Sequence, residues 1–463
     1  MRLAWFTPWP PQPSGIAGRS AAVLHELAAR DHAIDVFVDE TVVPISDRWP
    51  DDAASPGDVR LQSAHDFVWR QARRQYNLVI YQLGNSRLHE FIWPYLFRWP
   101  GLAVLHDARL HHARGRALLL RGHRQAYRAE FYWDGPEIPD GAAELAVHGF
   151  GGLYYYQWPM VRTIVESARL VATHTRGGQL GLAEAFPDRP IEYVALSHGS
   201  ASLIPGARRA AVRSSWGFPP DAVVFGVFGG LTHDKRIEPI LRTLAHVRAR
   251  APQVRLVLAG PSIQELDLEA VIRALGLEDI TRLLGVLDDE LFEDSIAAVD
   301  VSLNMRWPTA LEMSGPWLQA LAAGRPSILI DLPHLSDVPT LDPRTWRRHE
   351  PGSQSLDEDA AAIAVAVDIL DEEHSLSIAI EMLAQNPALR ERLGAAARHY
   401  WEQQHTITQM TDDYQRAIAR AAALEPPMVS LPPHMRPDAF AFTGSTLERF
   451  GASTLTAVEE LRK

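Results

Sequence analysis

Residues 223–237, Val223-Val-Phe-Gly-Val-Phe-Gly-Gly-Leu-Thr-His-Asp-Lys-Arg-Ile237, contain the pattern that decides the fold of this chain. Val223 to Phe228 is a short apolar run of the kind found in buried strands, and the two glycines that follow permit a tight turn. The residues from Ile237 to Ala251 then have the pattern of a helix. Such a junction directs backbone N–H groups and the positive end of the helix beyond the carboxyl edge of the strand. The stretch therefore predicts an α/β fold with an anion-binding site at that edge.

Lysine usage points to the same stretch. The chain has 45 basic residues, but only Lys235 and the final residue, Lys463, are lysines. A compact, flexible ammonium suits a phosphate whose negative charge grows as a leaving group departs. Lys235 is therefore a candidate phosphate ligand, and the alternative is an ordinary solvated lysine.

The composition is that of an ordinary globular protein, with 46% hydrophobic and 22% charged residues. At 463 residues the chain exceeds what one core usually organises, so we expect two domains of roughly 200 residues each. The net charge of −12 argues against general nucleic-acid binding. Cysteine is absent, which excludes disulfides, thiolate metal sites and a cysteine nucleophile. Because the sequence shows neither a signal-peptide core nor a membrane-spanning apolar run, a cytoplasmic location is expected.

The N-terminal residues predict the unit from which a doubly wound parallel sheet is built. Leu3 to Phe6 is a candidate buried strand, Arg19 to Arg30 has helical spacing, and Ala33 to Val38 is a second strand. The loop before the helix lies at the carboxyl edge of such a sheet, which faces the ligand crevice. Ser14 and Gly15 are therefore expected at the site, and the alternative is a plain surface loop.

Two further strands, Tyr76 to Leu83 and Gly101 to Leu105, are expected to end at the same edge. The second strand is followed directly by His106 and Asp107. A histidine in this position can donate a hydrogen bond into the crevice, and Asp107 could orient it. His106 is therefore a candidate site residue, and a structural histidine is the alternative.

Residues 108–128 locally reverse the negative charge of the chain. The segment has an apolar patch at 117–120, two adjacent histidines at 111 and 112, and no acidic residue. It could meet an anionic acceptor or make a peripheral contact with an anionic membrane surface. The alternative is a solvated helix face whose arginines pair with acidic residues elsewhere in the chain. The residues that follow, 131–160, are rich in aromatic side chains and are expected in the core. The six arginines of the segment are Arg109, Arg114, Arg116, Arg121, Arg124 and Arg128.

The second half of the chain repeats the alternation of strands and helices. The loop that contains Val286 follows one of these strands and is expected to meet a nucleobase through main-chain groups. Strands are predicted at 223–228, 254–259, 280–284, 300–304 and 327–330, and helices at 237–251, 265–276, 289–299, 357–371, 374–386 and 387–423.

A second anion-binding helix start is predicted near residue 314. Ser314 is a good N-cap candidate, Pro316 suits a first turn, and Gly324 ends the short helix. Together with the turn at Lys235, this helix start would suit a diphosphate. Glu312 cannot favour a phosphate, so a hydroxyl-rich group is its expected partner. The alternative is a capped structural helix.

These patterns divide the chain into five parts, with proline and glycine marking the linker and the tail. The expected parts are an N-terminal Rossmann-like domain at 1–200, a linker at 201–222, a C-terminal Rossmann-like domain at 223–395, terminal helices at 396–424 and an extended proline-rich tail at 425–463.

Taken in order, these motifs resemble the GT-B glycosyltransferases, in particular the retaining family 4 or "group 1" enzymes. The resemblance covers residues 1–420. Its pieces are the Ser14-Gly15-Ile16 loop, His106-Asp107, the segment from Phe228 to Arg236, the Leu256-to-Gly260 segment, the Gly285-to-Asp289 segment, and Glu312 through Pro326.

The resemblance implies two Rossmann-like domains that face an interdomain cleft holding a nucleotide-sugar. Lys235 and the main chain of Ser314 and Gly315 would hold the diphosphate, while His106 and Glu312 would contact the sugar. No metal or other cofactor is implied, because basic residues and helix ends neutralise the diphosphate. The donor-binding set is Ser14, Gly15, Gly229, Gly230, Lys235, Arg236, Val286, Glu312, Ser314, Gly315 and Gln319.

Two positions depart from the family pattern. Many members have an arginine where this chain has Gly230, and Arg236 or Arg306 could replace it. Many also have a second glutamate, which contacts the ribose, where this chain has Gln319, and Glu312 lies seven residues before that position instead of eight. A glutamine can still bind a ribose hydroxyl.

The expected function is that of a retaining hexosyltransferase, with His106, Lys235 and Glu312 as catalytic residues. It would move a sugar from a nucleoside-diphosphate sugar to a hydroxyl on a glycan, a lipid-linked molecule or a small molecule. The alternatives are a non-catalytic nucleotide-sugar-binding protein and a nucleotide-sugar epimerase of the same fold.

Overall fold

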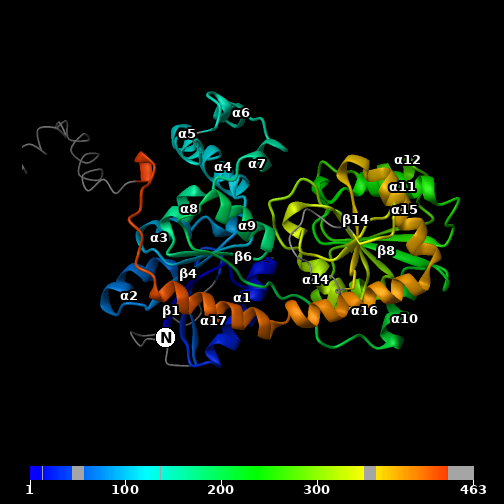
Figure 1. Cartoon of the computed structure of the whole chain (residues 1–463), viewed down its shortest axis with the longest axis horizontal. Helices are drawn as coiled ribbons and strands as arrows, with labels where there is room; N and C mark the ends of the chain where they lie inside the picture. The colour runs from blue at the N-terminus through cyan, green and yellow to red at the C-terminus, as the bar shows by residue number, and fades with distance from the viewer. Residues whose placement is uncertain (13, 44–56, 136, 349–360, 436–463) are drawn as a thin grey trace, which may run out of the picture.

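The computed structural model describes residues 1–12, 14–43, 57–135, 137–348 and 361–435 of the 463 residues. Within these ranges the chain forms two seven-stranded parallel sheets, each covered by helices. Figure 1 shows the two sheets side by side along the long axis of the molecule. The predicted α/β fold class with two doubly wound domains is confirmed.

The N-terminal sheet has the order β3-β2-β1-β4-β5-β6-β7. The order reverses beside β1, which lies between β2 and β4, so the crevice of this domain opens at the carboxyl end of β1. Alternate residues of β1 enter opposite cores, with Leu3 and Trp5 on one face and Ala4 and Phe6 on the other. The strands are β1 (Arg2–Phe6), β2 (Ala33–Val38), β3 (Val59–Ser63), β4 (Leu78–Leu83), β5 (Leu102–Leu105), β6 (Leu170–Thr173) and β7 (Ile191–Tyr193).

The helices of this half include a small lobe, α4 to α7, which stands out from the sheet in Figure 1. The aromatic residues expected in the core do pack there, around Tyr127, Phe131 and Tyr154. The helices are α1 (Gly15–Ala28), η1 (Ala64–Asp66), α2 (Phe67–Arg73), η2 (Arg87–His89), α3 (Trp93–Arg98), α4 (His111–Leu119), α5 (Arg124–Trp133), α6 (Ala142–Val147), α7 (Tyr154–Gln157), α8 (Arg162–Ser167) and α9 (Arg176–Ala185).

The C-terminal sheet has the order β10-β9-β8-β11-β12-β14-β13, so its crevice opens where β8 meets β11. Its strands are β8 (Val223–Phe228), β9 (Val254–Ala259), β10 (Thr281–Gly285), β11 (Val301–Asn304), β12 (Ser327–Ile330), β13 (Thr340–Leu341) and β14 (Ala364–Val367). Its helices are η3 (His233–Lys235), α11 (Ile237–Val247), α12 (Leu268–Ala274), α13 (Asp289–Ala298), α14 (Gly315–Ala322), η4 (Pro333–Leu335), η5 (Ile369–Asp371) and α15 (Glu372–Gln385).

The strands β14 and β3 differ from the sequence-based expectations. The prediction of a helix at 357–371 is wrong for the residues that the structure describes, because Ala364 to Val367 form β14 between β12 and β13. All four β14 residues are buried, and a short apolar run in a two-sided core favours a strand. The edge strand β3 was not predicted because its sequence, VRLQS, is mostly polar.

The segment expected to be a linker contains a helix, α10 (Gly206–Ser215), which packs on α13. Val212 and Trp216 enter the same core cluster as Val224 and Phe228 of β8. The hydrophobic residues of the segment therefore attach it to the C-terminal sheet.

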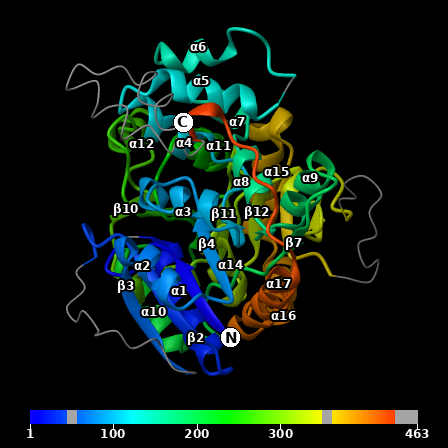
Figure 2. The same cartoon turned by 90° about the vertical axis from the view of Figure 1, so that its left-hand side faces the viewer.

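The last two long helices join the halves of the molecule. α16 (Pro387–Gln404) packs on α14, whereas α17 (Ile407–Ala423) returns to the first sheet and packs on α1 and β4. Figures 1 and 2 show both helices along one side of the molecule. One hydrophobic cluster includes Trp5 from the first half, Trp317 from the second, and Trp401 and Tyr414 from these helices.

The described part of the tail continues along the N-terminal half. Leu431 is buried, and the chain then forms η6 (Pro433–Met435), which packs on α5. The His434 Nε2 lies 2.8 Å from a carboxylate oxygen of Glu130 on that helix. Across the described residues, no helix combines the length and the hydropathy needed to cross a bilayer.

The position of α17 predicts a large stability contribution from Tyr414. Its ring is 1% exposed and lies 5.2 Å from that of Trp5, and its hydroxyl accepts a hydrogen bond from the Gln82 amide at 3.1 Å. Tyr414→Ala should lower the free energy of unfolding by about 3–5 kcal/mol in urea titrations, because a cavity replaces the ring. Tyr414→Phe should cost about 1–2 kcal/mol through the lost hydrogen bond.

Thr408→Ala, at an exposed position of the same helix, is the matched control and should change stability by less than about 0.5 kcal/mol. Equal stability of Tyr414→Ala and the control would show that the packing of α17 does not stabilise the N-terminal half.

Candidate active site

The carboxyl edge of the C-terminal sheet opens onto a cavity that brings several predicted site residues together. Segments that follow β8, β11 and β12 contribute to its lining. The cavity volume is about 30 Å³, so it could take only a small part of a nucleotide-sized ligand. The lining includes Phe228, Lys235, Asn304, Arg306, Glu312, Ser314, Trp317, Leu332 and His334.

Lys235 reaches the cavity because a tight turn follows β8. Gly229 has a φ of +87°, a conformation that favours glycine, and a Cβ built on it would lie 2.9 Å from the Lys235 Nζ. The ammonium donates a hydrogen bond to the carbonyl oxygen of Phe228. Burial, and then the neighbouring Arg306 guanidinium, lowers the pKa of Lys235 to about 7. Lys235 therefore loses its proton near neutral pH unless an anion stabilises the charged form.

The N-terminus of α14 points at the same cavity. Ser314 is the N-cap, as predicted, and its Oγ accepts a hydrogen bond from the Trp317 N–H at 3.4 Å. Pro316 lies against the turn after β8, since a Cβ on Gly229 would come within 3.4 Å of the proline Cγ. The Lys235 ammonium and the amino end of α14 therefore meet at one cavity, a geometry that suits an anionic group.

Glu312 is held by several groups in this arrangement. One carboxylate oxygen binds the Arg306 guanidinium, and the other accepts hydrogen bonds from Thr309 Oγ1 at 3.0 Å and the Ala310 N–H at 2.8 Å. Burial alone would raise the pKa of Glu312, but Arg306 and these hydrogen bonds outweigh it and hold the pKa below its usual value. Glu312 is therefore an ionised, fixed acceptor at the cavity wall.

The structure distinguishes the two arginines considered as replacements for an arginine at residue 230. Arg306 lines the cavity and lies 3.5 Å from an Asp234 carboxylate oxygen as well as contacting Glu312. Arg236 instead forms two hydrogen bonds with Glu372, at 2.8 and 2.5 Å, and is not part of the cavity lining. A Cβ on Gly230 would meet no atom within 4 Å, so packing does not require glycine there.

His106 lies at the carboxyl end of β5, as expected, but its partner differs from the prediction. Its Nε2 lies 2.7 Å from the side-chain oxygen of Gln82, and its ring centroid is 4.6 Å from that of His174. Asp107, predicted to orient it, instead accepts a hydrogen bond from the Asn85 N–H at 2.7 Å. Burial and then His174 lower the pKa of His106 well below its usual value, so the imidazole is neutral. His106 does not line the cavity around Lys235.

Asp107 faces the C-terminal half across the gap between the sheets. Burial and then the negative charge of Glu312 raise the pKa of Asp107 to about 7. The two carboxylates come from different halves of the chain, so their interaction depends on how the halves close. Sequence reasoning identified both residues but could not place them near each other.

His198 was not predicted, although it occupies the junction of the two halves. A Cβ on Gly15 would lie 3.7 Å from its Cε1, and a Cβ on Gly315 would lie 3.1 Å from the same atom. Gly15 begins α1 and Gly315 begins α14, with Ser14 as the N-cap of α1, so the imidazole lies between two helix N-termini. Burial, then Arg19 and His174, lowers the pKa of His198 to about 3. Its position shortly after β7 (Ile191–Tyr193) is the sequence signal that points to the sheet edge.

The two residues expected to contact the nucleoside lie outside the Lys235 cavity. Val286 is 75% exposed in the loop after β10. Gln319 lines a neighbouring cavity of about 40 Å³, and its amide donates a hydrogen bond to a Glu293 carboxylate oxygen at 3.3 Å. Glu293, which sequence reasoning missed, therefore provides a carboxylate beside the position where the family often has glutamate.

Among the described residues, which lie between residues 1 and 435, the candidate metal ligands are histidine, aspartate and glutamate side chains, since the chain has no cysteine. No group of three or more histidine, aspartate or glutamate residues there could hold a metal ion.

The comparisons with solved structures agree with this fold. The structure is similar to that of Anabaena HepE in complex with UDP and glucose, with a TM-score of 0.57 and 14% identity over 90% of this chain and 99% of that one. It is also similar to sucrose-phosphate synthase from Thermosynechococcus elongatus, with a TM-score of 0.60 and 16% identity over 90% and 99% of the two chains. The chain therefore has the GT-B fold.

The sequence comparisons match part of the chain to glycosyltransferases. Residues 222–370, which contain the Lys235 cavity, match the family model "Glycosyl transferases group 1". D-inositol 3-phosphate glycosyltransferase 2 from Catenulispora acidiphila is 28% identical over 232 residues, which are 48% of this chain and 49% of that protein. The chain thus aligns with about half the length of this curated relative. The resemblance to group 1 glycosyltransferases is confirmed.

The pKa of Asp107 gives a prediction about stability. In the unfolded chain this carboxyl would titrate at its ordinary value of 3.8, whereas burial and Glu312 raise its pKa to about 7 in the folded protein. Its ionisation therefore costs folded-state stability as the pH rises through this window. Asp107→Asn cannot ionise, so its melting temperature relative to wild type should increase from pH 4 to pH 7 and then stay constant.

Asp188→Asn is the control, because Asp188 is exposed and far along the chain from this pair. A difference between Asp107→Asn and wild type that does not change with pH would contradict the raised pKa of Asp107.

Proposed function

We propose that the protein is a retaining glycosyltransferase that moves a sugar from a nucleoside-diphosphate sugar to a hydroxyl acceptor. The observation that carries this proposal is the meeting of the Lys235 ammonium and the N-terminus of α14 at one cavity. The family match covers this part of the chain, and the similar HepE structures contain UDP or UDP-glucose. A diphosphate bound at the cavity would be the feature that this protein shares with those complexes.

In this proposal the chain acts mainly on the leaving group. The bond between the sugar carbon and the diphosphate oxygen breaks, and the acceptor oxygen forms a bond to the same carbon on the same face. The acceptor proton passes to the departing diphosphate. Lys235, Arg306 and the N–H groups at the start of α14 would stabilise the negative charge that develops. We also propose that no metal is needed.

The remaining site residues would position the sugar and the nucleoside. Neutral His106, from the N-terminal half, and ionised Glu312 would bind sugar hydroxyl groups. The main chain around Val286 would bind the base, while Gln319 with Glu293 would bind the ribose. Ser14 and Gly15 would close the site from the side of α1.

The proposal predicts that one nucleotide among UDP, GDP, TDP and ADP raises the melting temperature of the protein in the presence of EDTA, since it binds only the folded state. Lys235→Ala should remove this increase and lower donor turnover by about 10²–10³-fold, because one cation no longer faces the leaving group. In the wild type, nucleotide affinity should fall as the pH rises from 6 to 9, since Lys235, with a pKa of about 7, loses its charge.

Arg242→Ala, on the exposed surface of nearby α11, is the control and should change neither readout. Unchanged nucleotide binding and turnover in Lys235→Ala would overturn the assignment. Products formed with no acceptor present separate the alternatives: an epimerised nucleotide-sugar would indicate an epimerase, and no reaction with any donor would indicate a non-catalytic protein.

We further propose a peripheral contact between a cytoplasmic protein and an anionic membrane through residues 108–128. Ion pairs of Arg114, Arg121 and Arg128 with Glu130, Glu90 and Glu144 favour the alternative of a paired helix face for half of the arginines. The end of α4, the turn after it and the start of α5, however, expose Arg116, Leu120 and Arg124, and Leu120 is 76% exposed. Neither Arg116 nor Arg124 has a carboxylate partner among the described residues. This segment is the part that would contact lipid.

Sedimentation with lipid vesicles tests this contact. Vesicles with a third of phosphatidylserine should bind the protein, and neutral vesicles should not. Arg116→Glu/Arg124→Glu should lower binding at least fivefold, since each basic residue near the surface contributes about 1 kcal/mol. The control Arg248→Glu/Arg273→Glu, on the C-terminal half, should bind as wild type. Binding that ignores anionic lipid content would contradict the proposal.

A further inference from the structure

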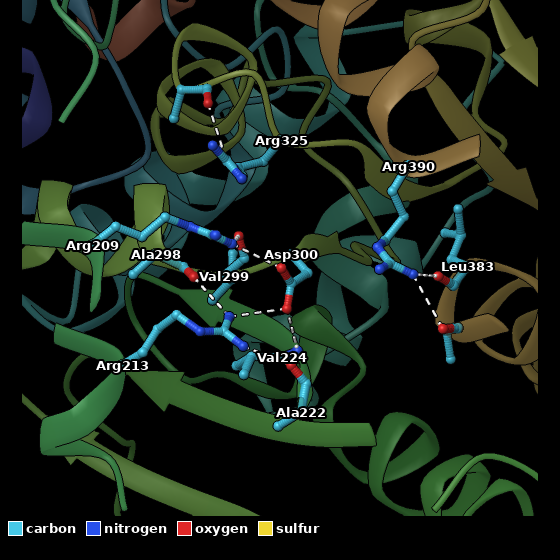
Figure 3. Close-up of polar contacts among 12 residues, drawn as sticks. Arg209, Arg213, Ala222, Val224, Ala298, Val299, Asp300, Arg325, Leu383 and Arg390 are labelled. Atoms are coloured by element: carbon cyan, nitrogen blue, oxygen red, sulfur yellow. Dashed lines mark hydrogen bonds and ion pairs between the residues drawn. The ribbon is translucent and has the colours of Figure 1, made fainter. Parts of the chain in front are cut away.

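Four arginines gather at the edge of the C-terminal sheet opposite the candidate active site. Arg209 and Arg213 lie one turn apart on α10, Arg325 lies in the loop before β12, and Arg390 lies in the first turn of α16. Figure 3 shows their guanidinium groups around Asp300, which directly precedes β11. Because β11 and β12 begin at this edge, the cluster is at the amino ends of the strands whose carboxyl ends lead to the Lys235 cavity.

The single aspartate at the centre is bound by both arginines of α10. One Asp300 carboxylate oxygen accepts a hydrogen bond from Arg209 at 2.8 Å. The other accepts from Arg213 at 2.9 Å and from the Val224 N–H at 2.8 Å. Asp300 therefore binds both α10 arginines, and its single negative charge offsets only one of their two positive charges.

Arg325 and Arg390 have only backbone partners. Arg325 donates through Nε to the Ala323 carbonyl oxygen at 3.0 Å, and Arg390 donates to the carbonyl oxygens of Leu383 and Ala384. Within the described part of the chain, neither forms an ion pair with a carboxylate. Burial, and then the positive charge of Arg209, lowers the pKa of Arg325 to about 10. The two guanidinium groups thus lie in a positive electrostatic potential, which a bound anion would lower.

The cluster lines a real cavity. Its volume is about 360 Å³, within the range of sites for small ligands. Three arginines of the cluster, Arg209, Arg325 and Arg390, are in the lining, and its acidic residues are Asp300 and the exposed Glu391, so three guanidinium groups face two carboxylates. Helix α16 begins at this cavity with Asn386 as its N-cap, and its positive end adds to the potential. The lining residues are Arg209, Asp300, Gly324, Arg325, Pro326, Pro387, Arg390 and Glu391.

We propose that this arginine-lined cavity binds a small phosphorylated anion, held by Arg325 and Arg390, separately from the candidate active site. Guanidinium groups present paired N–H donors that match phosphate oxygens, and they keep their charge at all physiological pH values. The volume accommodates one or two phosphate groups with a small organic part. The ligand is either inorganic phosphate or pyrophosphate, or a phosphorylated metabolite that presents the same group.

Calorimetric titration of Lys235→Ala protein with inorganic pyrophosphate tests the proposal, because this variant removes the phosphate-binding cation of the candidate active site. One saturable site per chain is expected, with an affinity that falls as sodium chloride increases. Arg325→Gln/Arg390→Gln in the same background should weaken binding at least tenfold. The control Arg248→Gln/Arg255→Gln should bind as the parent, since both arginines lie on the same half outside the cavity.

Two further measurements complete the test. Arg325→Lys/Arg390→Lys, which keeps the charge, should recover part of the affinity, and this readout holds if the glutamine pair unfolds. Titrations with inorganic phosphate and glucose 6-phosphate compare the two sources, and tighter binding of either supports a phosphate site. No saturable binding of any of the three anions at 10 mM, or unchanged pyrophosphate affinity in a folded glutamine pair, would overturn the proposal.

Discussion

The arrangement of the site depends on a buried ammonium. Lys235 lies almost wholly out of water, next to a strand carbonyl and against the first turn of α14. Burying a cation is costly unless other groups compensate, and here Asp234 and Glu312 provide negative charge while Arg306 opposes it. Because of this balance, the protonation state of Lys235 depends on which groups enter the cavity. The tight turn at Gly229 is what allows so close an approach.

The sequence predicted most of the fold because the central strands are apolar runs that end in glycine or in a polar pair, as at Phe228 and Leu105. It failed for β3, whose residues are mostly polar, and for β14, where nearby acidic residues suggested a helix. Lys235, Glu312 and Ser314 could be predicted because each lies close to a local turn or cap signal. His198 and Glu293 could not be placed beside α14 from the sequence, since their contacts with this helix are made only after distant segments pack together.

The C-terminal sheet has a charged cavity at each end of its central strands, and α14 extends between them. Its first residue, Gly315, is at the Lys235 cavity, and the loop that follows it carries Arg325. Both cavities use the same principle: cations are placed at a sheet edge beside the positive end of a helix. The two cavities differ in how far carboxylates offset the positive charge. Glu312 and Asp234 offset Arg306 at one edge, whereas among the described residues Arg325 and Arg390 form no ion pair with a carboxylate at the other.

The return of α17 to the N-terminal sheet means that the polypeptide passes between the two halves twice, once near residue 200 and again between α16 and α17. Trp401 reinforces the second passage by donating from its indole to the His198 carbonyl oxygen at 2.6 Å, so the two passages are fastened to each other. Two adjacent connections form a hinge between the two halves. They permit rotation about the line that joins them and resist sliding or twisting. Any widening of the gap would therefore separate Asp107 from Glu312 along an arc, while the contacts at His198 remain near the axis.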